Sequence, residues 1–125
     1  MVDDSRAAHF LMKEAFKDAS MDSQLHMVEN GDDALSFLKK EGGFEKMPTP
    51  DLVLLDLNMP GKSGWDVLDE IKKDEMLQKI AVVLLSGSEA ASDRKTCSKF
   101  NCKFVMKPAR FHELVELVKS LPDLY

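Results

Sequence analysis

The sequence has 125 residues, of which 44% are hydrophobic, and its formal net charge is −5 at pH 7. This length fits a single domain, and the apolar content is high enough for a buried core, which argues against an intrinsically disordered chain. The acidic balance disfavours nucleic acid as a partner, and no apolar run approaches the roughly 18 residues that a membrane-spanning helix needs.

The first segment with a clear pattern is a helix. Residues 5–20 place apolar side chains on one stripe, and Asp4 or Ser5 can cap the N-terminus of this helix. In front of it, only Met1 and Val2 are left to form a strand. Two residues span about 7 Å, whereas an average strand has about 5–6 residues. A leading strand would therefore be a short stub.

Strand and helix patterns then alternate along the rest of the chain. We expect strands at residues 24–29, 51–55, 80–86 and 103–107, and helices at residues 32–40, 65–74, 89–100 and 110–121. The runs at 51–55 and 80–86 are apolar throughout, as expected of strands that are covered on both faces. This alternation predicts an α/β fold, a parallel sheet with helices on both faces, in one domain over residues 1–125.

The location of the protein is predicted from its charged residues and its cysteines. Asp3, Asp4 and Arg6 stand where a secretory leader would need apolar residues. Cys97 and Cys102 are too few and too oddly spaced for a disulfide scaffold or a zinc site. We expect these cysteines to be reduced, mostly buried thiols, and the protein to be cytoplasmic.

Polar residues gather at the ends of the expected strands. In a parallel sheet these C-terminal ends lie along one edge, where ligands bind. The groups expected there are three carboxylates, a hydroxyl and an ammonium, from Asp3, Asp4, Asp56, Ser86 and Lys107. Three carboxylates a few ångströms apart repel one another unless a cation lies among them. Oxygen ligands without His or Cys favour a hard cation such as Mg²⁺, and the backbone carbonyl of Asn58 could supply a further oxygen.

Together these groups suit phosphoryl transfer. Lys107 and Mg²⁺ would neutralise charge on a phosphoryl group, and Asp56 would be the nucleophile, as carboxylates are in aspartyl-phosphate chemistry. Each residue alone has an ordinary structural explanation: Asp56 as a strand-end residue, Asp3 and Asp4 as a helix cap, and Lys107 as a surface lysine. Their joint placement favours a site.

Four short motifs each end an expected strand. They are VDDS at residues 2–5, LLDLNMPGKSG at 54–64, LLSGS at 84–88 and FVMKPA at 104–109. With these motifs in this order, the sequence resembles a response-regulator receiver domain over essentially the whole chain apart from its short start. The resemblance implies a flavodoxin-like (βα)5 fold, with a doubly wound parallel sheet of five strands in the order 2-1-3-4-5 and a truncated first strand.

The resemblance also implies a role in two-component signal transduction. A histidine kinase would phosphorylate Asp56, and Mg²⁺ would bind Asp4, Asp56 and the Asn58 carbonyl directly and Asp3 through water. The domain would not be an enzyme, since it would assist only its own phosphorylation and dephosphorylation. The loop at 41–50 and the segment at 71–86 look like those of single-domain receivers linked to phytochrome-type kinases.

Three further residues take roles from the resemblance. Ser86 would bond a phosphoryl oxygen, Lys107 would pair with the phosphoryl group, and Phe104 would be the switch aromatic that moves inward with Ser86. The Lys107–Pro108 bond is commonly cis in this family, and X-Pro bonds tolerate cis well. With no output domain in the sequence, signalling would come from docking of an unknown downstream protein around the last strand and the last two helices. Phe104 has an alternative role as simple core or partner surface.

The short first strand is the main departure from the family. Its missing residues would leave backbone groups on both neighbouring strands unpaired, at about 1–3 kcal/mol for each buried group. A misassigned start, a chain cut short, and a strand completed by another chain all stay open. The last of these would make the protein a homodimer or a similar assembly through strand addition.

Two other functions compete with the phosphorylated receiver. The same fold could serve as a binding or dimerisation module that acts without phosphorylation. A small Mg²⁺-dependent phosphohydrolase is the other alternative, but haloacid-dehalogenase-like phosphatases have a second Asp two residues after the nucleophile, where this chain has Asn58. The chain is also too short for a substrate cap, so a hydrolase is disfavoured.

Overall fold

The computed structural model describes residues 1–21, 23–57, 59, 61–87, 91–100, 102–108 and 110–123. Within these ranges the strands are β1 (Leu52–Asp56), β2 (Ala81–Ser86) and β3 (Lys103–Met106). The helices are α1 (Arg6–Asp18), α2 (Gly31–Lys39), α3 (Gly64–Lys73), α4 (Ala91–Lys99) and α5 (Phe111–Ser120), and a 3-10 turn, η1 (Leu121–Asp123), follows α5. The α/β alternation predicted from the sequence is confirmed.

The sheet has a fully paired part and a part held by single bridges. β1 pairs in parallel with β2, and β2 pairs in parallel with β3. On the other side of β1, Val2 forms parallel bridges to both Leu55 and Val28. The spatial order is therefore Val28, Val2, β1, β2 and β3, which follows the order 2-1-3-4-5, with the first two positions reduced to bridges among the described residues.

The prediction of a continuous strand at residues 24–29 is wrong. Among the described residues, only Val28 forms a bridge there, to Val2, and the Asp3 amide donates to the Val28 carbonyl at 3.1 Å. The Met1 amino group donates to the His26 carbonyl at 2.7 Å, and the Val28 amide donates to the Met1 carbonyl at 3.0 Å. The stub is thus bonded to the neighbouring segment, but it is too short to make that segment a strand.

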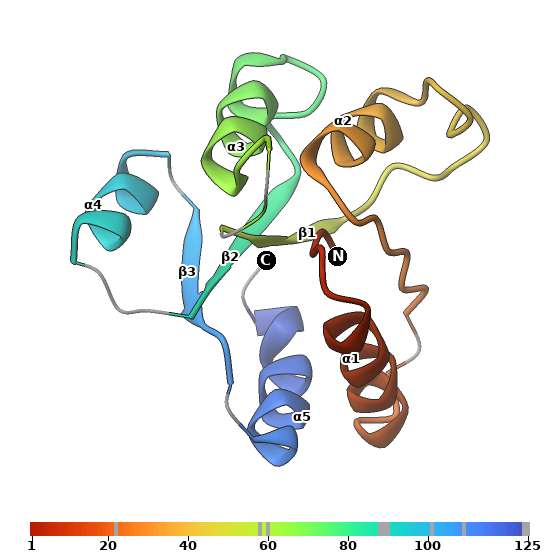
Figure 1. Ribbon diagram of the computed structural model, residues 1–125, viewed down its shortest axis with the longest axis vertical. Coiled ribbons are helices and arrows are strands. Elements are labelled where there is room, and N and C mark those ends of the chain that lie inside the picture. Colours follow the sequence, from red (N-terminus) through yellow and green to blue (C-terminus); the bar gives the residue numbers. More distant parts are fainter. Residues whose placement is uncertain are drawn as a thin grey trace.

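Helices cover both faces of the sheet (Figure 1). α1 and α5 pack together on one face, and α2 and α3 pack together on the other. Alternate sheet residues enter two cores: Leu54, Val83 and Leu85 pack toward α1 and α5, and Val53, Leu55, Val82 and Leu84 pack toward α2 and α3. Across the described residues, every helix is too short or too polar to cross a bilayer.

Local caps start three helices shortly after the strand or bridge that precedes each of them. The Ser5 hydroxyl accepts from the Ala8 amide, and the Asn30 side chain accepts from the Asp33 amide. Ser63 begins α3 with a capping box. Because α1 and α3 begin at the C-terminal edge of the sheet, the loops in front of them are held at that edge.

The two cysteines differ from the expectation of reduced thiols. Cys97 in α4 and Cys102 in front of β3 are joined as a disulfide. The turn from α4 to β3 brings their Cα atoms to 5.4 Å, a separation that a disulfide spans readily. The spacing in the sequence did not reveal this pairing, because it depends on how tightly the turn closes.

Candidate functional site

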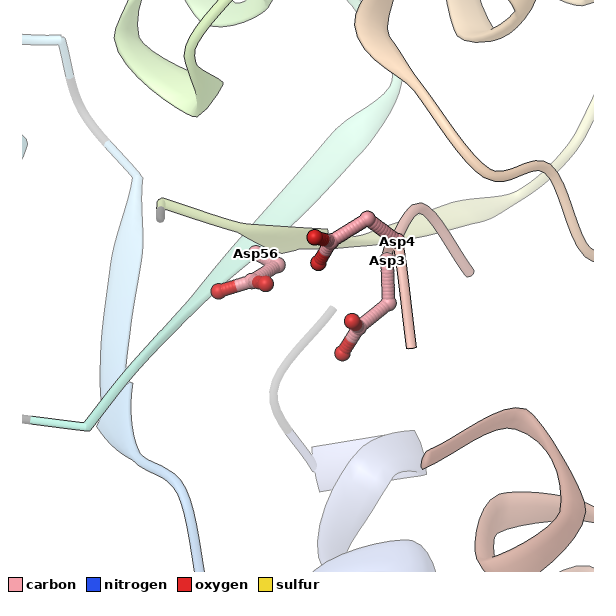
Figure 2. Close-up of side chains that lie close together, drawn as sticks. All are labelled: Asp3, Asp4 and Asp56. Atoms are coloured by element: carbon pink, nitrogen blue, oxygen red, sulfur yellow. The ribbon is translucent and has the colours of Figure 1, made fainter. Parts of the chain in front are cut away.

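Three aspartates meet at the C-terminal edge of the sheet. Asp56 ends β1, and Asp3 and Asp4 directly follow the Val2 bridge beside it. One carboxylate oxygen from each lies within 4.8 Å of the others, and Figure 2 shows the three side chains gathered at this point. Asp3 and Asp56 are 0% and 2% exposed, whereas Asp4 is exposed to solvent. The site therefore has two buried acids and one accessible acid.

Lys107 supplies a cation to the two buried acids. Its Nζ atom lies 3.2 Å from Oδ2 of Asp3 and 3.2 Å from Oδ2 of Asp56. Burial acts to lower the pKa of the Lys107 ammonium, but the charges of the two carboxylates outweigh it and raise that pKa above its ordinary value. Lys107 follows β3 directly, and its amide donates to the Ser86 carbonyl at 2.7 Å.

The prediction of a cis peptide bond after Lys107 is wrong. The bond between Lys107 and Pro108 is trans, as are all peptide bonds in the described part of the chain. Trans is the more stable form of X-Pro bonds by about 0.5–1 kcal/mol.

The N-terminal acids are positioned by a few backbone bonds. The Val2 amide donates to the Leu54 carbonyl at 2.8 Å, and the Asp56 amide donates to the Val2 carbonyl at 3.0 Å. The Asp3 carboxylate accepts from the Ser5 amide at 2.9 Å through Oδ1, while its Oδ2 faces Lys107. Two paired residues are thus enough to bring this acidic segment beside the end of β1.

The predicted switch residues lie on the two strands next to β1. Ser86 ends β2 and is 1% exposed. A Cβ atom built on the neighbouring Gly87 would meet nothing within 4 Å, so the space beside it is open. Phe104 lies on β3 and is half-buried against the core on the α2 and α3 face. Asn58, which was expected to supply a carbonyl ligand, lies outside the described residues.

The loop after β1 is held close to the site by features that were not assigned a role from the sequence. A Cβ atom at Gly64 would lie 2.5 Å from the Asp56 carbonyl oxygen and 2.8 Å from Cα of Leu57, so only glycine permits this approach. Lys62 bonds Glu70 at 3.2 Å and lies 3.6 Å from Asp32. Gly64 in the motif at residues 54–64 was the sequence signal for the close approach of the loop to Asp56.

The chemistry of the donors fits a hard divalent cation. Three carboxylates and one ammonium leave two negative charges at this edge, which one divalent cation would balance. The clustered metal-ligating side chains in the described residues are all carboxylates, without His or Cys. Oxygen donors of this kind select Mg²⁺, Ca²⁺ or Mn²⁺ over softer metals.

Comparison with known proteins identifies the family. The family model of the response regulator receiver domain matches residues 1–119 of this chain. The chain belongs to this family. The response regulator Rcp1 of Synechocystis sp. is 34% identical over 127 residues, which cover 100% of this chain and 86% of that protein.

Two crystal structures show the same fold. The phosphorylated cyanobacterial phytochrome response regulator RcpA is 34% identical, with a TM-score of 0.88 over 98% of this chain and 88% of that chain. The Mn²⁺-bound form of response regulator Rcp1 is 33% identical, with a TM-score of 0.86 over 98% of this chain and 88% of that chain. The receiver family, its fold class and its place in two-component signal transduction, all predicted from the motifs, are confirmed.

Proposed function

We propose that this receiver is phosphorylated on Asp56 by a histidine kinase in a reaction that requires Mg²⁺. The observation that carries this proposal is the shared contact of Lys107 with Asp3 and Asp56, next to the exposed carboxylate of Asp4. The burial of this carboxylate at the end of a strand, the ammonium beside it and the open space at Gly87 support this role, because carboxylates are the nucleophiles of aspartyl-phosphate chemistry.

The reaction follows from these positions. An Oδ atom of Asp56 attacks the phosphorus of a phosphohistidine on the kinase, a P–O bond forms and the P–N bond breaks. The departing imidazole nitrogen keeps the electron pair and takes up a proton. Lys107 then pairs with a phosphoryl oxygen. Mg²⁺, when bound, supplies positive charge to the phosphoryl oxygens in the transition state.

The proposed metal ligands are Asp4, Asp56 and the carbonyl of Asn58, with Asp3 acting through water. The hydrogen bonds of Asp3 support this division, because one of its oxygens faces the Ser5 amide and the other faces Lys107. Asp4 is exposed to solvent and offers one carboxylate oxygen to the cluster. The assignment of Asn58 rests on the family resemblance alone.

Phosphorylation would be transmitted through Ser86 and Phe104. A phosphoryl group on Asp56 would attract the Ser86 hydroxyl, and the half-buried Phe104 on the adjacent strand would move further into the space that this shift leaves. The face formed by α4, β3 and α5 would then change its affinity for an unknown downstream protein or for a second copy of the chain. The names of the relatives favour a phytochrome-type kinase as the phosphodonor, in the cytoplasm. The domain would turn over no substrate other than its own phosphoryl group.

Intact-mass spectrometry after incubation with acetyl phosphate and Mg²⁺ tests this function. We expect one phosphoryl adduct on the native chain and none on Asp56→Asn. Asp18→Asn is the matched control, because it removes an exposed carboxylate at the far end of α1 and should leave the adduct intact. Circular dichroism of all three proteins establishes that each is folded.

Two results would contradict the proposal. A folded native chain that takes up no phosphoryl group with acetyl phosphate or with an autophosphorylated phytochrome-type kinase would favour a binding module that works without phosphorylation. An adduct of equal yield on Asp56→Asn would move the acceptor to another residue.

A further inference from the structure

The disulfide between Cys97 and Cys102 closes the turn that joins α4 to β3. Figure 1 shows α4 beside β3, which is the last strand in the order of the sheet. The structure describes the side chains of α4 at residues 95–99, and among these only Cys97 is buried. Directly after the helix, the ring of Phe100 stacks on Trp65 of α3, with 6.5 Å between the ring centroids. The disulfide and this ring pair therefore fasten the end of α4 to the rest of the domain.

The two sulfurs of this disulfide differ in their access to solvent. Cys97 is 2% exposed and belongs to the core on the α2 and α3 face. Cys102 is half-buried and packs at the border of the same core. Thiol–disulfide exchange depends on which sulfur an attacking thiolate can reach. Cys102 is therefore the sulfur open to attack, and Cys97 is the leaving group.

The ring that this disulfide closes is short, because its two cysteines are only five positions apart in the sequence. In the chain-entropy model, a disulfide that closes a short loop stabilises the folded chain less than one that closes a long loop. Disulfides of intracellular proteins are also rare, and those that form there are usually transient, with catalytic or redox-sensing roles. In the cytoplasm proposed for this domain, a short and accessible disulfide fits a reversible role better than a permanent structural one.

We propose that the Cys97–Cys102 disulfide is a thiol-exchange site, and that its reduction by a dithiol reductant frees the end of α4 from β3. Phe104 follows Cys102 by two positions and packs on the same core, so the release also loosens the packing around Phe104. The exchange requires neither Mg²⁺ nor phosphorylation of Asp56. It is thus a second input to the face formed by α4, β3 and α5.

The reduction transfers two electrons from the reductant to the chain. A thiolate of the reductant attacks Sγ of Cys102, a new S–S bond forms, and the bond to Cys97 breaks. Sγ of Cys97 keeps the electron pair and takes up a proton, because its apolar surroundings disfavour the charge. The second thiolate of the reductant then attacks its own sulfur in the mixed disulfide. Cys102 leaves with the electron pair and takes up a proton, and the reductant ends as an internal disulfide.

Treatment of the oxidised, folded chain with dithiothreitol, without denaturant, metal or phosphodonor, tests the proposal. Rapid alkylation and intact-mass spectrometry should find both cysteines free, and the oxidant diamide should restore the disulfide. Hydrogen exchange measured by mass spectrometry should become faster on reduction at residues 96–104 and stay unchanged in α1. Circular dichroism establishes that the reduced chain is folded. Because no phosphodonor is present, a failure of Asp56 to become phosphorylated would leave these results unchanged.

Two single variants form a matched pair that tests the point of attack. Cys97→Ala keeps the accessible sulfur, whereas Cys102→Ala keeps the buried one. With oxidised glutathione, Cys97→Ala should form a mixed disulfide at least about tenfold faster than Cys102→Ala, because exchange depends on access. Both variants lack the disulfide, so hydrogen exchange at residues 96–104 should be as fast as in the reduced native chain, with or without dithiothreitol.

Four results would overturn the proposal. A disulfide that resists dithiothreitol until urea unfolds the chain would be purely structural. Cysteines that stay free after diamide treatment of the folded chain would leave no bond to exchange. Unchanged hydrogen exchange at residues 96–104 after reduction would mean that the bond does not hold α4. Equal rates of mixed-disulfide formation in Cys97→Ala and Cys102→Ala would contradict the assigned point of attack.

Discussion

The two sides of β1 differ in how completely they are paired, yet both deliver acids to the same site. Toward β2 and β3 the ladder is continuous, whereas toward Val2 and Val28 it consists of single bridges next to a cavity. Asp56 comes from β1, and Asp3 and Asp4 come from the bridged side. A few backbone bonds are therefore enough to place carboxylates, whereas filling a core requires a longer strand.

The largest expected difference between the two sides is in how much a leucine side chain contributes to the free energy of unfolding. Leu84 is 0% exposed on β2, so Leu84→Ala should lower the free energy of unfolding by about 2–5 kcal/mol. Leu25 is half-buried beside the cavity, and Leu25→Ala should cost less than about 1 kcal/mol, because little apolar contact is lost. Urea unfolding of both variants measures the contrast. Equal losses would mean that the bridged side is packed as tightly as the paired side.

The next effect is a pH dependence from the Met1 amino group, on the bridged side. The pKa of the Met1 amino group is lowered by burial from 8.0 to about 6, so between these values the unfolded chain binds more protons than the folded chain. The free energy of unfolding is therefore highest above pH 8, where the amino group is neutral in both states. It falls as the pH is lowered toward 6, by at most about 3 kcal/mol.

Acetylation of Met1 supplies the matched control for this pH effect. It removes the charge but keeps an N–H group that can donate to the His26 carbonyl. Urea unfolding at several values from pH 8 to pH 6 should show a smaller slope for the acetylated chain, which carries the same His9, His26 and His112 as the unmodified chain. Identical slopes would show that the amino group is solvated in the folded state.

Most of the paired side could be predicted from the sequence, because its signals are local. The apolar runs at 51–55 and 80–86 are β1 and β2 within a residue or two, and α1 begins directly after Ser5, one of its two expected caps. The strand at 24–29 could not be judged in the same way, since its alternating pattern says nothing about the length of its neighbour. The disulfide between Cys97 and Cys102 depends on a tertiary turn and left no local signal.

The candidate site was also largely predictable, because a parallel sheet places its strand ends together. Asp3, Asp4, Asp56 and Lys107 meet as expected, and Ser86 ends the adjacent strand. The sequence does not indicate which acid is buried. Asp3 is enclosed because Ser5 and Lys107 bond its two oxygens, whereas Asp4 lies in the same cluster but is exposed to solvent.

The smallest expected effect tests whether both sides of β1 contribute to cation binding. Mg²⁺ at ten times its dissociation constant should raise the free energy of unfolding of the native chain by about 1.4 kcal/mol. Asp56→Asn removes a carboxylate from the paired side and Asp4→Asn removes one from the bridged side, so each variant should lose most of this increase. Asp18→Asn should retain it. Thermal unfolding with and without Mg²⁺ measures the difference for each variant. A full response in Asp4→Asn together with a lost response in Asp56→Asn would confine the cation to the end of β1, and the bridges at Val2 would then serve the fold and not the metal.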